Sequence, residues 1–346
     1  MKIIINGKFL SQKITGVQRF AREILLELDN IVEPGMFEIA VEKNFKESLP
    51  YKNIELAKIG AFRGNLWEQI SLPRYVKKQK AECLSLCNSS PLLCSNYITV
   101  FDMKIKAHPE FFSWRFKTWY NFLFSKSLMR SKIIFTDSEF AKKEIIKYYP
   151  KCSPSKIKVV YCGWQHFFRI PYDELALSKR GLKKGNYFFA MSSLDPNKNF
   201  SWIATQAKLN PTFLFVVSGS VNSRVFSKDF GFDVPENMKL LGYVSDSEAK
   251  TLMRDCNAFL FPSIYEGFGI PPLEAIASGC NAVILSNIEV MHEVYGDYAY
   301  YIDEKFSIKS FKKSSSIACS TNLLSKYSWS KAATIILQSI QSGINE

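Results

Sequence analysis

The segment from Pro262 to Val283, P-S-I-Y-E-G-F-G-I-P-P-L-E-A-I-A-S-G-C-N-A-V, constrains the fold of this 346-residue chain more than any other. The apolar run 258–261 before it predicts a buried strand, and residues 282–285 predict the next one. Between them, Pro271-Pro272 is typical of a first helical turn, where a missing N–H costs nothing, and Gly279 is typical of a helix end. The segment therefore predicts a strand, a glycine turn, a helix and a strand in succession.

Two carboxylates separated by seven residues stand inside this segment. Glu266 precedes the turn Gly267-Phe268-Gly269, and Glu274 is expected in the first turn of the helix. Backbone N–H groups and the positive end of the helix should both face the mouth of the turn, which makes an anion site. Carboxylates accept hydrogen bonds and do not donate them, so beside an anion they suit hydroxyls rather than phosphates. An anion together with hydroxyls indicates a sugar nucleotide.

The length and composition of the chain fit two cored domains. Apolar residues make up 47% and charged residues 22%, which excludes a disordered protein. No apolar run approaches the roughly 18 residues of a transmembrane helix. The first run, Ile3–Ile5, ends at Asn6-Gly7 and is too short for a signal peptide. We therefore expect a cytoplasmic protein that begins directly with its fold.

Cysteine and histidine spacing gives no metal pattern. The eight cysteines and three histidines are scattered, and Cys83, Cys87 and Cys94 form the one cluster. Their spacing matches no common zinc site. We predict thiols in a reducing compartment and no bound metal.

Positive charge is concentrated in the first half of the chain. Residues 1–168 hold 27 basic and 15 acidic residues, a net +12, whereas residues 169–346 hold 18 and 17, a net +1. This excess indicates an anionic partner or serves solubility. No motif that reads DNA or RNA accompanies it, so no nucleic-acid partner is expected.

An aromatic segment in this half stands out. Eight of the fourteen residues 111–124 are Phe, Trp or Tyr, and Lys126, Arg130 and Lys132 follow. Trp and Tyr suit a water–lipid boundary, and Lys and Arg suit anionic head groups. Two interpretations stay open, an anionic membrane surface at 111–132 and a buried helix with a few bases that reach the solvent.

Strands and helices alternate in both halves, which predicts two parallel α/β domains. The alternation starts with a strand at 2–6, a polar loop and a helix from Gly16. Periodicity is lost between residues 165 and 186. We therefore predict a first domain at 1–168, a second at 169–326, and a final helical segment at 327–346.

Five segments resemble the retaining glycosyltransferases of family 4, which have the GT-B fold. E-G-F-G-I-P-P-L-E-A at 266–275 resembles that family's E-x7-E signature. Residues 16–23 resemble its first glycine loop and helix, in the version of bacterial cell-surface polysaccharide enzymes of the O-antigen and capsule type. Residues 192–199 resemble its phosphate-binding segment, and 242–246 the loop that meets the nucleobase. Tyr327-Ser328-Trp329 resembles the start of its terminal helix.

The resemblance implies a fold and an activity. The fold is GT-B, α/β, with two Rossmann-like domains facing across a cleft and a C-terminal helix that crosses back to the first domain. The donor would bind mainly on 187–290, and the acceptor hydroxyl would come from the first domain. The enzyme would move a hexose from a nucleotide-diphosphate sugar to a hydroxyl of a lipid-linked oligosaccharide or cell-surface glycan precursor, with retention. The version of the first glycine loop leans toward mannose-like or deoxyhexose donors such as GDP-mannose.

The resemblance also implies residue roles. Glu266 would hold the donor sugar's hydroxyls and Glu274 the ribose hydroxyls. Lys198 would neutralise the departing diphosphate, and Gly16 would let the backbone approach the phosphates. The implied catalytic residues are Glu266, Lys198 and Asp102, the last on the acceptor side. The implied donor-binding residues are Gly16, Ser193, Asn197, Lys198, Val244, Gly267, Phe268, Gly269, Ile270 and Glu274.

The chain departs from the family's pattern at three positions, one of which is Asn281 in place of the usual proline. Asn197 stands where the family usually has Arg, and Phe101-Asp102 where it usually has His-Asp. No D-x-D motif occurs, so neither a metal nor another cofactor is expected. Three alternatives stay open: another GT-B enzyme, such as a sugar-nucleotide epimerase or a phosphorylase, a degenerate transferase, and a module that binds anionic membranes. The expected location is the cytoplasm, with a peripheral place on the inner face of the cytoplasmic membrane as an option.

Overall fold

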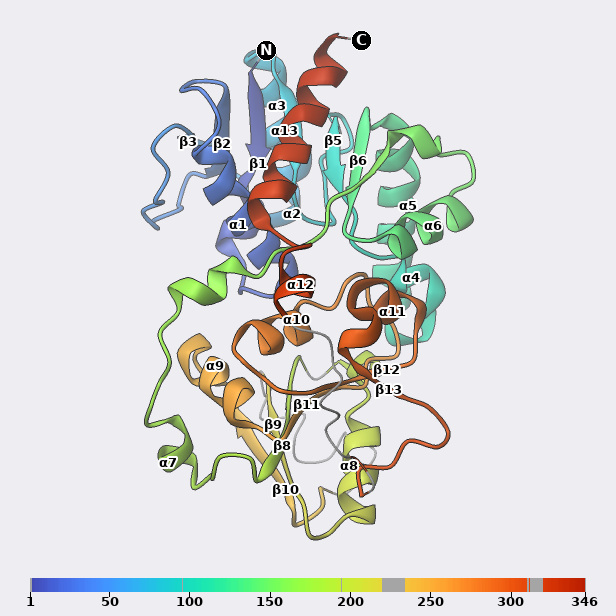
Figure 1. Cartoon of the computed structure of the whole chain (residues 1–346). Helices are drawn as coiled ribbons and strands as arrows, with labels where there is room; N and C mark the ends of the chain where they lie inside the picture. Colours follow the sequence, from blue (N-terminus) through green and yellow to red (C-terminus); the bar gives the residue numbers. More distant parts are fainter. Residues whose placement is uncertain are drawn as a thin grey trace. The chain divides into compact units, whose positions relative to one another are not determined.

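The structure, a computed structural model, describes residues 2–94, 96–193, 195–219, 234–309, 311 and 320–345. The chain divides into two compact units (Figure 1). Unit 1 comprises Met1–Gly163 and Ser328–Glu346, and unit 2 comprises Trp164–Tyr327. The predicted borders lay at 168/169 and 326/327.

Unit 1 is built on a parallel sheet of seven strands in the order β3-β2-β1-β4-β5-β6-β7. In the register of the sheet, Ile4 pairs with Glu38 on one side and with Cys83 on the other. Central strands buried on both faces read as apolar runs, which is why Ile3-Ile4-Ile5 marked the first strand. The strands are β1 (Ile3–Asn6), β2 (Phe37–Glu42), β3 (Glu55–Ile59), β4 (Glu82–Ser85), β5 (Tyr97–Thr99), β6 (Ile133–Thr136) and β7 (Ile157–Val159).

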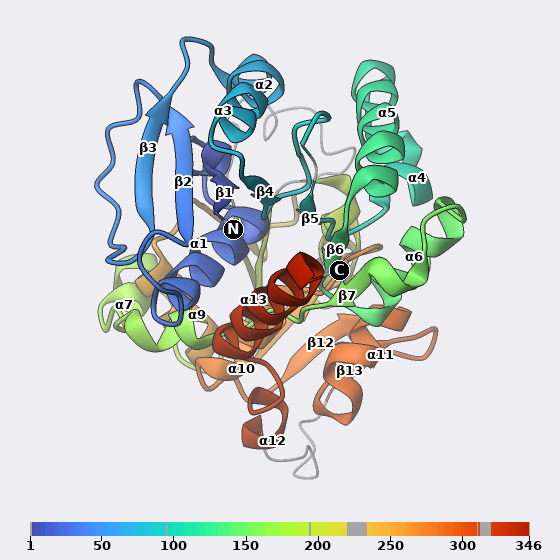
Figure 2. The ribbon, with the colours of Figure 1, turned by 90° about the horizontal axis from the view of Figure 1, so that it is seen from above.

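Helices cover both faces of this sheet, with α1 and α13 on one face and α3 and α5 on the other (Figure 2). The α-helices are α1 (Gly16–Asp29), α2 (Gly64–Leu66), α3 (Leu72–Lys78), α4 (Lys104–Ala107), α5 (Trp114–Arg130), α6 (Glu139–Tyr148) and α13 (Trp329–Asn345). Shorter turns are η1 (Gly7–Ser11), the π-helix η2 (Trp67–Ser71), η3 (Pro109–Phe111) and η4 (Pro154–Lys156).

The last helix belongs to the first unit. Helix α13 packs on α1, and its Trp329 is fully buried with its ring 5.8 Å from that of Phe20. Ile336 and Ile340, at helical spacing from Trp329, are also fully buried. The prediction that the C-terminal helix returns to the first domain is confirmed.

Unit 2 has a parallel sheet of six strands in the order β10-β9-β8-β11-β12-β13. The strands are β8 (Tyr187–Met191), β9 (Leu214–Ser218), β10 (Met238–Gly242), β11 (Ala258–Phe261), β12 (Val283–Ser286) and β13 (Tyr300–Ile302). The helices are η5 (Gln165–Arg169), α7 (Ala176–Arg180), η6 (Pro196–Lys198), α8 (Phe200–Leu209), α9 (Asp246–Asp255), α10 (Ile270–Ala277), α11 (Glu289–Tyr295), η7 (Gly296–Tyr298) and α12 (Ser320–Leu324).

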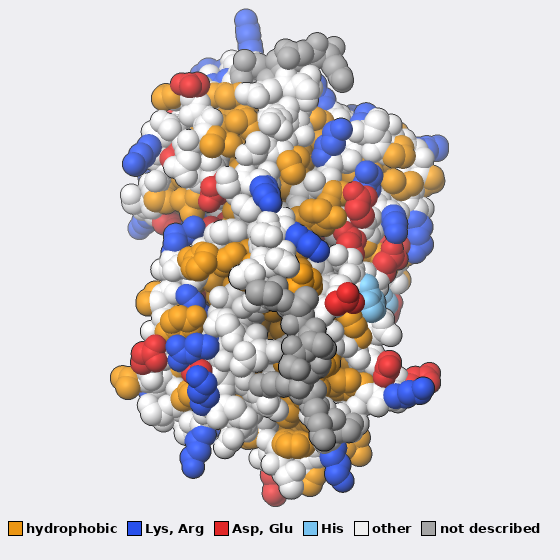
Figure 3. Space-filling view, in the orientation of Figure 1, with side chains coloured by type: hydrophobic (Ala, Val, Ile, Leu, Met, Phe, Trp, Pro, Cys, Tyr) orange, Lys and Arg blue, Asp and Glu red, His pale blue; other side chains and the backbone are white. Residues whose placement is uncertain are grey.

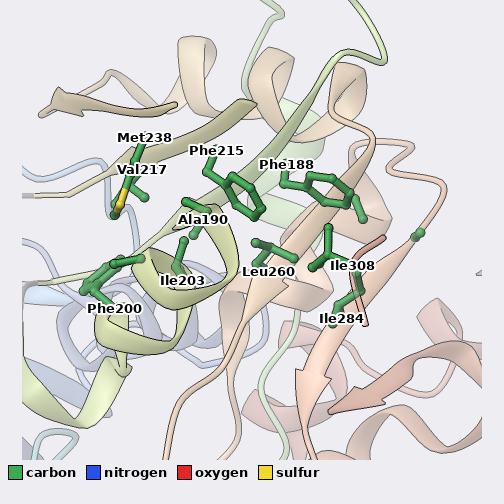
Figure 4. Close-up of a cluster of buried hydrophobic side chains, with 14 residues drawn as sticks. Phe188, Ala190, Phe200, Ile203, Phe215, Val217, Met238, Leu260, Ile284 and Ile308 are labelled. Carbon is green, nitrogen blue, oxygen red and sulfur yellow. The ribbon is translucent and has the colours of Figure 1, made fainter. Parts of the chain in front are cut away.

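The core on one face of this sheet lies between the strands and α8 (Figure 4). Phe188 and Phe215 stack on neighbouring strands with ring centroids 5.4 Å apart. Leu260 of β11 continues the apolar layer, and Phe200 and Ile203 of α8 close it. The strands β8 and β11, which carry the candidate site at their ends, are therefore fixed by burial.

The prediction of two parallel α/β, Rossmann-like domains is confirmed. Residues 64–78 form α2, η2 and α3 in succession rather than one continuous helix, with Gly64 at φ +56° at the start and Pro73 in the first turn of α3. None of the helices among the described residues is long and apolar enough to cross a membrane.

Candidate functional site

The candidate site lies where the strand order of unit 2 reverses. From β8 the chain moves out to β9 and β10 on one side, and then returns to β11 on the other side of β8. The loops that follow β8 and β11 therefore leave neighbouring strands at the same edge of the sheet and diverge. Such a switch point at the carboxyl ends of parallel strands leaves a crevice in which ligands bind.

The loop after β8 is shaped by its own polar side chains. Asp195 accepts a hydrogen bond from the backbone N–H of Asn197 at 3.0 Å and caps the turn η6. Asn199 then takes the left-handed conformation, with φ 54°, and α8 begins. Lys198 stands between these two residues. Leu194, in the same loop, lies outside the described residues.

The loop after β11 depends on glycine at one position. Gly269 has φ +87°, and a Cβ placed there would lie 2.7 Å from Cε of Met291. The carbonyl of Gly269 also accepts a hydrogen bond from the Tyr295 hydroxyl. Helix α10 begins at the next residue, with proline in its first turn as predicted.

Three contacts join these two loops. The side-chain amide of Asn197 donates to the carbonyl of Tyr265 at 2.7 Å, and the N–H of Ile264 donates to the carbonyl of Asn197 at 2.8 Å. The Lys198 ammonium forms an ion pair with the Glu266 carboxylate. The structure thus brings together two predicted catalytic residues that are 68 positions apart in the chain.

The Lys198–Glu266 pair is only partly exposed. The two side chains are 17% and 14% accessible, and the Lys198 ammonium lies 5.1 Å from the centre of the Phe261 ring. Low exposure strengthens the attraction between the two charges relative to a pair on the open surface. An ammonium and a carboxylate side by side at a crevice can bind a phosphate and hydroxyls, respectively.

The buried Asn197 side chain links the two loops. Its side chain is 1% exposed, and its Oδ1 has no hydrogen-bond partner among the described residues. Its amide group is used on Tyr265. Where family 4 glycosyltransferases usually have Arg, this chain therefore has an Asn that holds the two loops together.

The prediction that Glu274 lies in the first turn of its helix is wrong, because Glu274 is the fifth residue of α10. Its side chain is nearly buried, and its Oε1 lies 2.8 Å from Nε2 of His166, which is 2% exposed. His166 comes from η5, at the start of unit 2. Sequence reasoning missed this pair, because the two residues are 108 positions apart and no local spacing links them.

The Phe268 side chain anchors the glycine turn. It is 2% exposed and meets the ring of Tyr327 edge-on at 5.4 Å. Tyr327 donates its hydroxyl to the carbonyl of Val294 at 2.9 Å, and burial raises the pKa of Tyr327 to about 12. The Phe268 side chain is therefore occupied inside unit 2, so only its backbone is available to a ligand. Gly267 is buried and Ile270 is half-buried.

The remaining donor-side residues of unit 2 lie at the same edge of the sheet. Ser193 is exposed in the loop after β8. Val244 follows β10, two strands away from β8, and is 6% exposed. The roles of Ser193 and Val244 in donor binding stay predictions.

Gly16 and Asp102 belong to unit 1. Gly16 is the exposed first residue of α1, after the N-cap Thr15. Asp102 follows β5, and its Oδ1 accepts from the N–H of Lys104 at 2.9 Å. The preceding Phe101 is 5% exposed and packs edge-on against Phe20 with ring centroids 4.9 Å apart. The position that holds His in the resembling family is therefore part of the core next to α1.

Unit 1 has a polar cluster at its own switch point, between β1 and β4. Glu68, in the π-helix η2, is 2% exposed. It accepts hydrogen bonds from Asn6 at 2.8 Å and Ser89 at 2.7 Å, and it pairs with Lys8 at 2.8 Å. Sequence reasoning missed this cluster. The sequence feature that could have indicated it is Asn6, a polar residue directly after the apolar run Ile3–Ile5.

No group of three or more metal-ligating side chains occurs in the described parts of the chain.

Comparisons with known proteins point to one class of enzyme. Residues 174–331 match the family model of glycosyl transferases group 1. The O-antigen chain mannosyltransferase RfbU of Salmonella typhimurium is 29% identical over 324 residues, which cover 88% of each chain. The O-antigen chain mannosyltransferase B of Escherichia coli is 30% identical over 192 residues, 51% of this chain and 49% of that protein.

Solved structures share the fold. Sucrose-phosphate synthase from Thermosynechococcus elongatus superposes with a TM-score of 0.77 at 11% identity, covering 99% of both chains. Anabaena Alr3699/HepE in complex with UDP and glucose has a TM-score of 0.72 at 16% identity, covering 99% of this chain and 100% of that one. These likenesses establish the GT-B fold. With a group 1 domain over most of unit 2 and a mannosyltransferase matched along most of its length, the chain is a glycosyltransferase.

Proposed function

We propose that this enzyme moves a mannose-like hexose from a nucleotide-diphosphate sugar, with GDP as the preferred nucleotide, to a hydroxyl of a lipid-linked O-antigen-type precursor. The observation that carries the proposal is the Lys198–Glu266 pair, held at the switch point of unit 2 within the group 1 domain. The choice of mannose and of the acceptor follows the names of the two O-antigen mannosyltransferases that the chain resembles.

Each loop would take one part of the donor. Glu266 would accept hydrogen bonds from the sugar hydroxyls, and Lys198 would leave it to meet the diphosphate. The N–H groups from Gly267 to Ile270, at the start of α10, would add donors for the anion. Glu274 would accept from the ribose hydroxyls while His166 fixes the direction of its carboxylate.

The reaction we propose retains the anomeric configuration. The bond between the anomeric carbon and the phosphate oxygen breaks, and the bond to the acceptor oxygen forms on the same face of the sugar. The proton of the acceptor hydroxyl goes to the departing phosphate oxygen. Lys198 would neutralise the charge that develops on the diphosphate, a type of contact typically worth about 100- to 1,000-fold in rate. No step needs a metal, and Asp102 of unit 1 would serve the acceptor side.

Turnover of two lysine variants tests the donor site. Lys198→Ala should lower kcat by about 100-fold, because one contact to the leaving group is lost. Lys184→Ala is the matched control, since Lys184 is a unit 2 lysine that pairs with Asp255 at 3.4 Å and is 76% exposed. Glu274→Ala should weaken donor binding. Wild-type kinetics in both Lys198→Ala and Glu274→Ala would contradict the assignment.

Binding and product analysis test the remaining parts. At 100 times its dissociation constant, the correct nucleotide diphosphate should stabilise the protein by about 2.7 kcal/mol, and GDP should do so at lower concentration than UDP. NMR of the product should show the donor's anomeric configuration, and EDTA should leave the rate unchanged. Conversion of the donor sugar without an acceptor would point to an epimerase instead.

A further inference from the structure

One exposed stripe on α5 combines basic and apolar side chains. Arg115, Trp119, Phe122, Lys126 and Met129 follow one another at intervals of four and three residues, which places them on one side of the helix. All five are exposed, with Trp119 at 37%, Phe122 at 48% and Met129 at 46%. The Trp119 and Phe122 rings lie 6.3 Å apart. We call these five residues the α5 stripe.

The opposite side of α5 holds the helix in unit 1. Leu123 and Phe124 are buried, and so are Ser127 and Leu128 one turn later. Phe124 and Leu128 belong to a core cluster with Ile98 and Ile134 of the sheet. Because this side already anchors the helix, the fold does not need the apolar residues of the stripe, and their exposure calls for another explanation.

The ends of α5 extend the apolar surface. At its start, Trp114 is 67% and Phe116 41% exposed, and the Arg115 guanidinium lies 5.5 Å from the Trp114 ring. At its end, Arg130 donates to the carbonyl of Leu92 at 2.6 Å. The next residue, Leu93, is 76% exposed, so this loop adds a protruding aliphatic side chain near the end of the helix.

A recess adjoins that loop. Leu93 lines a cavity of about 500 Å³ together with Arg74 and Lys77 of α3. Gln69 of η2, another lining residue, accepts a hydrogen bond from the N–H of Leu92 at 3.0 Å and so ties η2 to the loop that Arg130 holds. The recess offers two cations next to apolar side chains.

The charge of residues 111–132 indicates which kind of partner can cover the α5 stripe. Residues 111–132 contain five Lys and Arg and no Asp or Glu. Lys132 pairs with Glu82, which leaves four bases along α5. A second copy of the chain would bring equal positive charge against the same charge, so self-association through this side is disfavoured. Elsewhere, on the face shown in Figure 3, Lys and Arg are scattered over both units among acidic and apolar side chains.

We propose that the α5 stripe, with Trp114, Phe116 and Leu93, docks unit 1 onto an anionic lipid bilayer. Aromatic rings and Met enter the interface between head groups and acyl chains, and Arg115 and Lys126 meet lipid phosphates. The inference rests on the proposed function in one respect, since a lipid-linked acceptor gives the enzyme a reason to be at a membrane. The geometry that carries it is independent of the donor site.

Vesicle flotation tests the docking directly. The wild type should float with vesicles of phosphatidylglycerol and phosphatidylcholine and much less with phosphatidylcholine alone, and added salt should weaken the binding. Arg115→Gln with Lys126→Gln should weaken partitioning by about 25-fold, at about fivefold for each base. Trp119→Ser with Phe122→Ser should weaken it at least as much.

Matched controls come from unit 2. Lys184→Gln removes a base that is 76% exposed, and Leu209→Ser removes an apolar side chain that is 68% exposed. Both should bind vesicles as the wild type does. Equal binding by the stripe variants would overturn the proposal, as would strong wild-type binding to phosphatidylcholine alone. A wild-type dimer in sedimentation that Trp119→Ser breaks would overturn it in favour of self-association.

A separate readout keeps the two proposals apart. Nucleotide-diphosphate affinity measured without vesicles should be the same in the stripe variants and the wild type, and this also shows that the variants are folded. Loss of vesicle binding with unchanged nucleotide affinity supports the docking surface. Absence of nucleotide binding in the wild type would refute the donor assignment and leave the vesicle result standing.

Discussion

Two glycines at the ends of α10 offer a paired test of the glycine turn. Gly269 precedes the helix and Gly279 follows it, and both have φ +87°. A Cβ at 269 would lie 2.7 Å from Cε of Met291, whereas a Cβ at 279 would meet only Cγ of Arg254, at the ordinary distance of 3.9 Å. The variants Gly269→Ala and Gly279→Ala therefore share the backbone strain and differ in crowding.

The expected magnitudes follow from that difference. A non-glycine residue in the left-handed region costs about 1–2 kcal/mol, which both variants should lose from the free energy of unfolding. Crowding in a packed interior adds about 1–3 kcal/mol, and this should appear only in Gly269→Ala. The Met291 side chain is flexible at its end, so the lower part of that range is expected. A displaced turn at 267–270 should also weaken nucleotide-diphosphate binding in this variant alone.

Urea unfolding and calorimetric titration with the nucleotide diphosphate provide the two measurements. The linear dependence of unfolding free energy on urea gives the stability of each variant. If Gly269→Ala loses no more stability than Gly279→Ala and binds the nucleotide as tightly, Met291 does not crowd position 269. If Gly269→Ala does lose more stability than Gly279→Ala but binds the nucleotide as tightly as the wild type, the role of the turn in donor binding is wrong.

Two further substitutions, at His166 and Phe101, test contacts that could not be predicted from the sequence. His166→Phe keeps a flat ring but removes the hydrogen bond to the buried Glu274, so it should cost about 1–3 kcal/mol of stability and weaken donor affinity. His292→Phe, at an exposed ring, is the control, and equal effects of the two in urea unfolding would count against the pair. Phe101→His puts a polar ring beside Phe20 in the core, so it should lower the unfolding free energy by about 1–3 kcal/mol; unchanged stability would show that position 101 is not packed as described.

Local sequence patterns predicted some of the strands and helices. Tyr187–Met191 and Ala258–Phe261 are buried parallel strands that appear as unbroken apolar runs, and the structure places both where the runs lie. Helix α9, Asp246–Asp255, follows the N-cap Ser245, a residue type typical of that position. These elements can be recognised from residues that are close in the chain.

Contacts between distant residues could not be predicted in the same way. Lys198 and Glu266 were each placed by a separate motif, but their ion pair depends on β8 and β11 being neighbours, which only the strand order decides. His166 and Glu274 meet through packing of η5 against α10, and no period in the sequence encodes it. Similarly, the composition of 111–124 marked the segment as unusually aromatic, but did not show which rings are buried and which are exposed.

The return of α13 to unit 1 has a consequence for the order in which the chain folds as it is made. Chains emerge from the ribosome starting at the N-terminus, and domains tend to fold as units when they are complete. The ends of unit 2 lie together, since Gln165 donates to the carbonyl of Tyr327 at 2.9 Å. Unit 2 is thus complete once residue 327 has emerged, whereas the core of unit 1 still lacks Trp329. The half of the protein that is synthesised first is finished last, and a stop codon that removed only the final helix would leave the opening domain without part of its core.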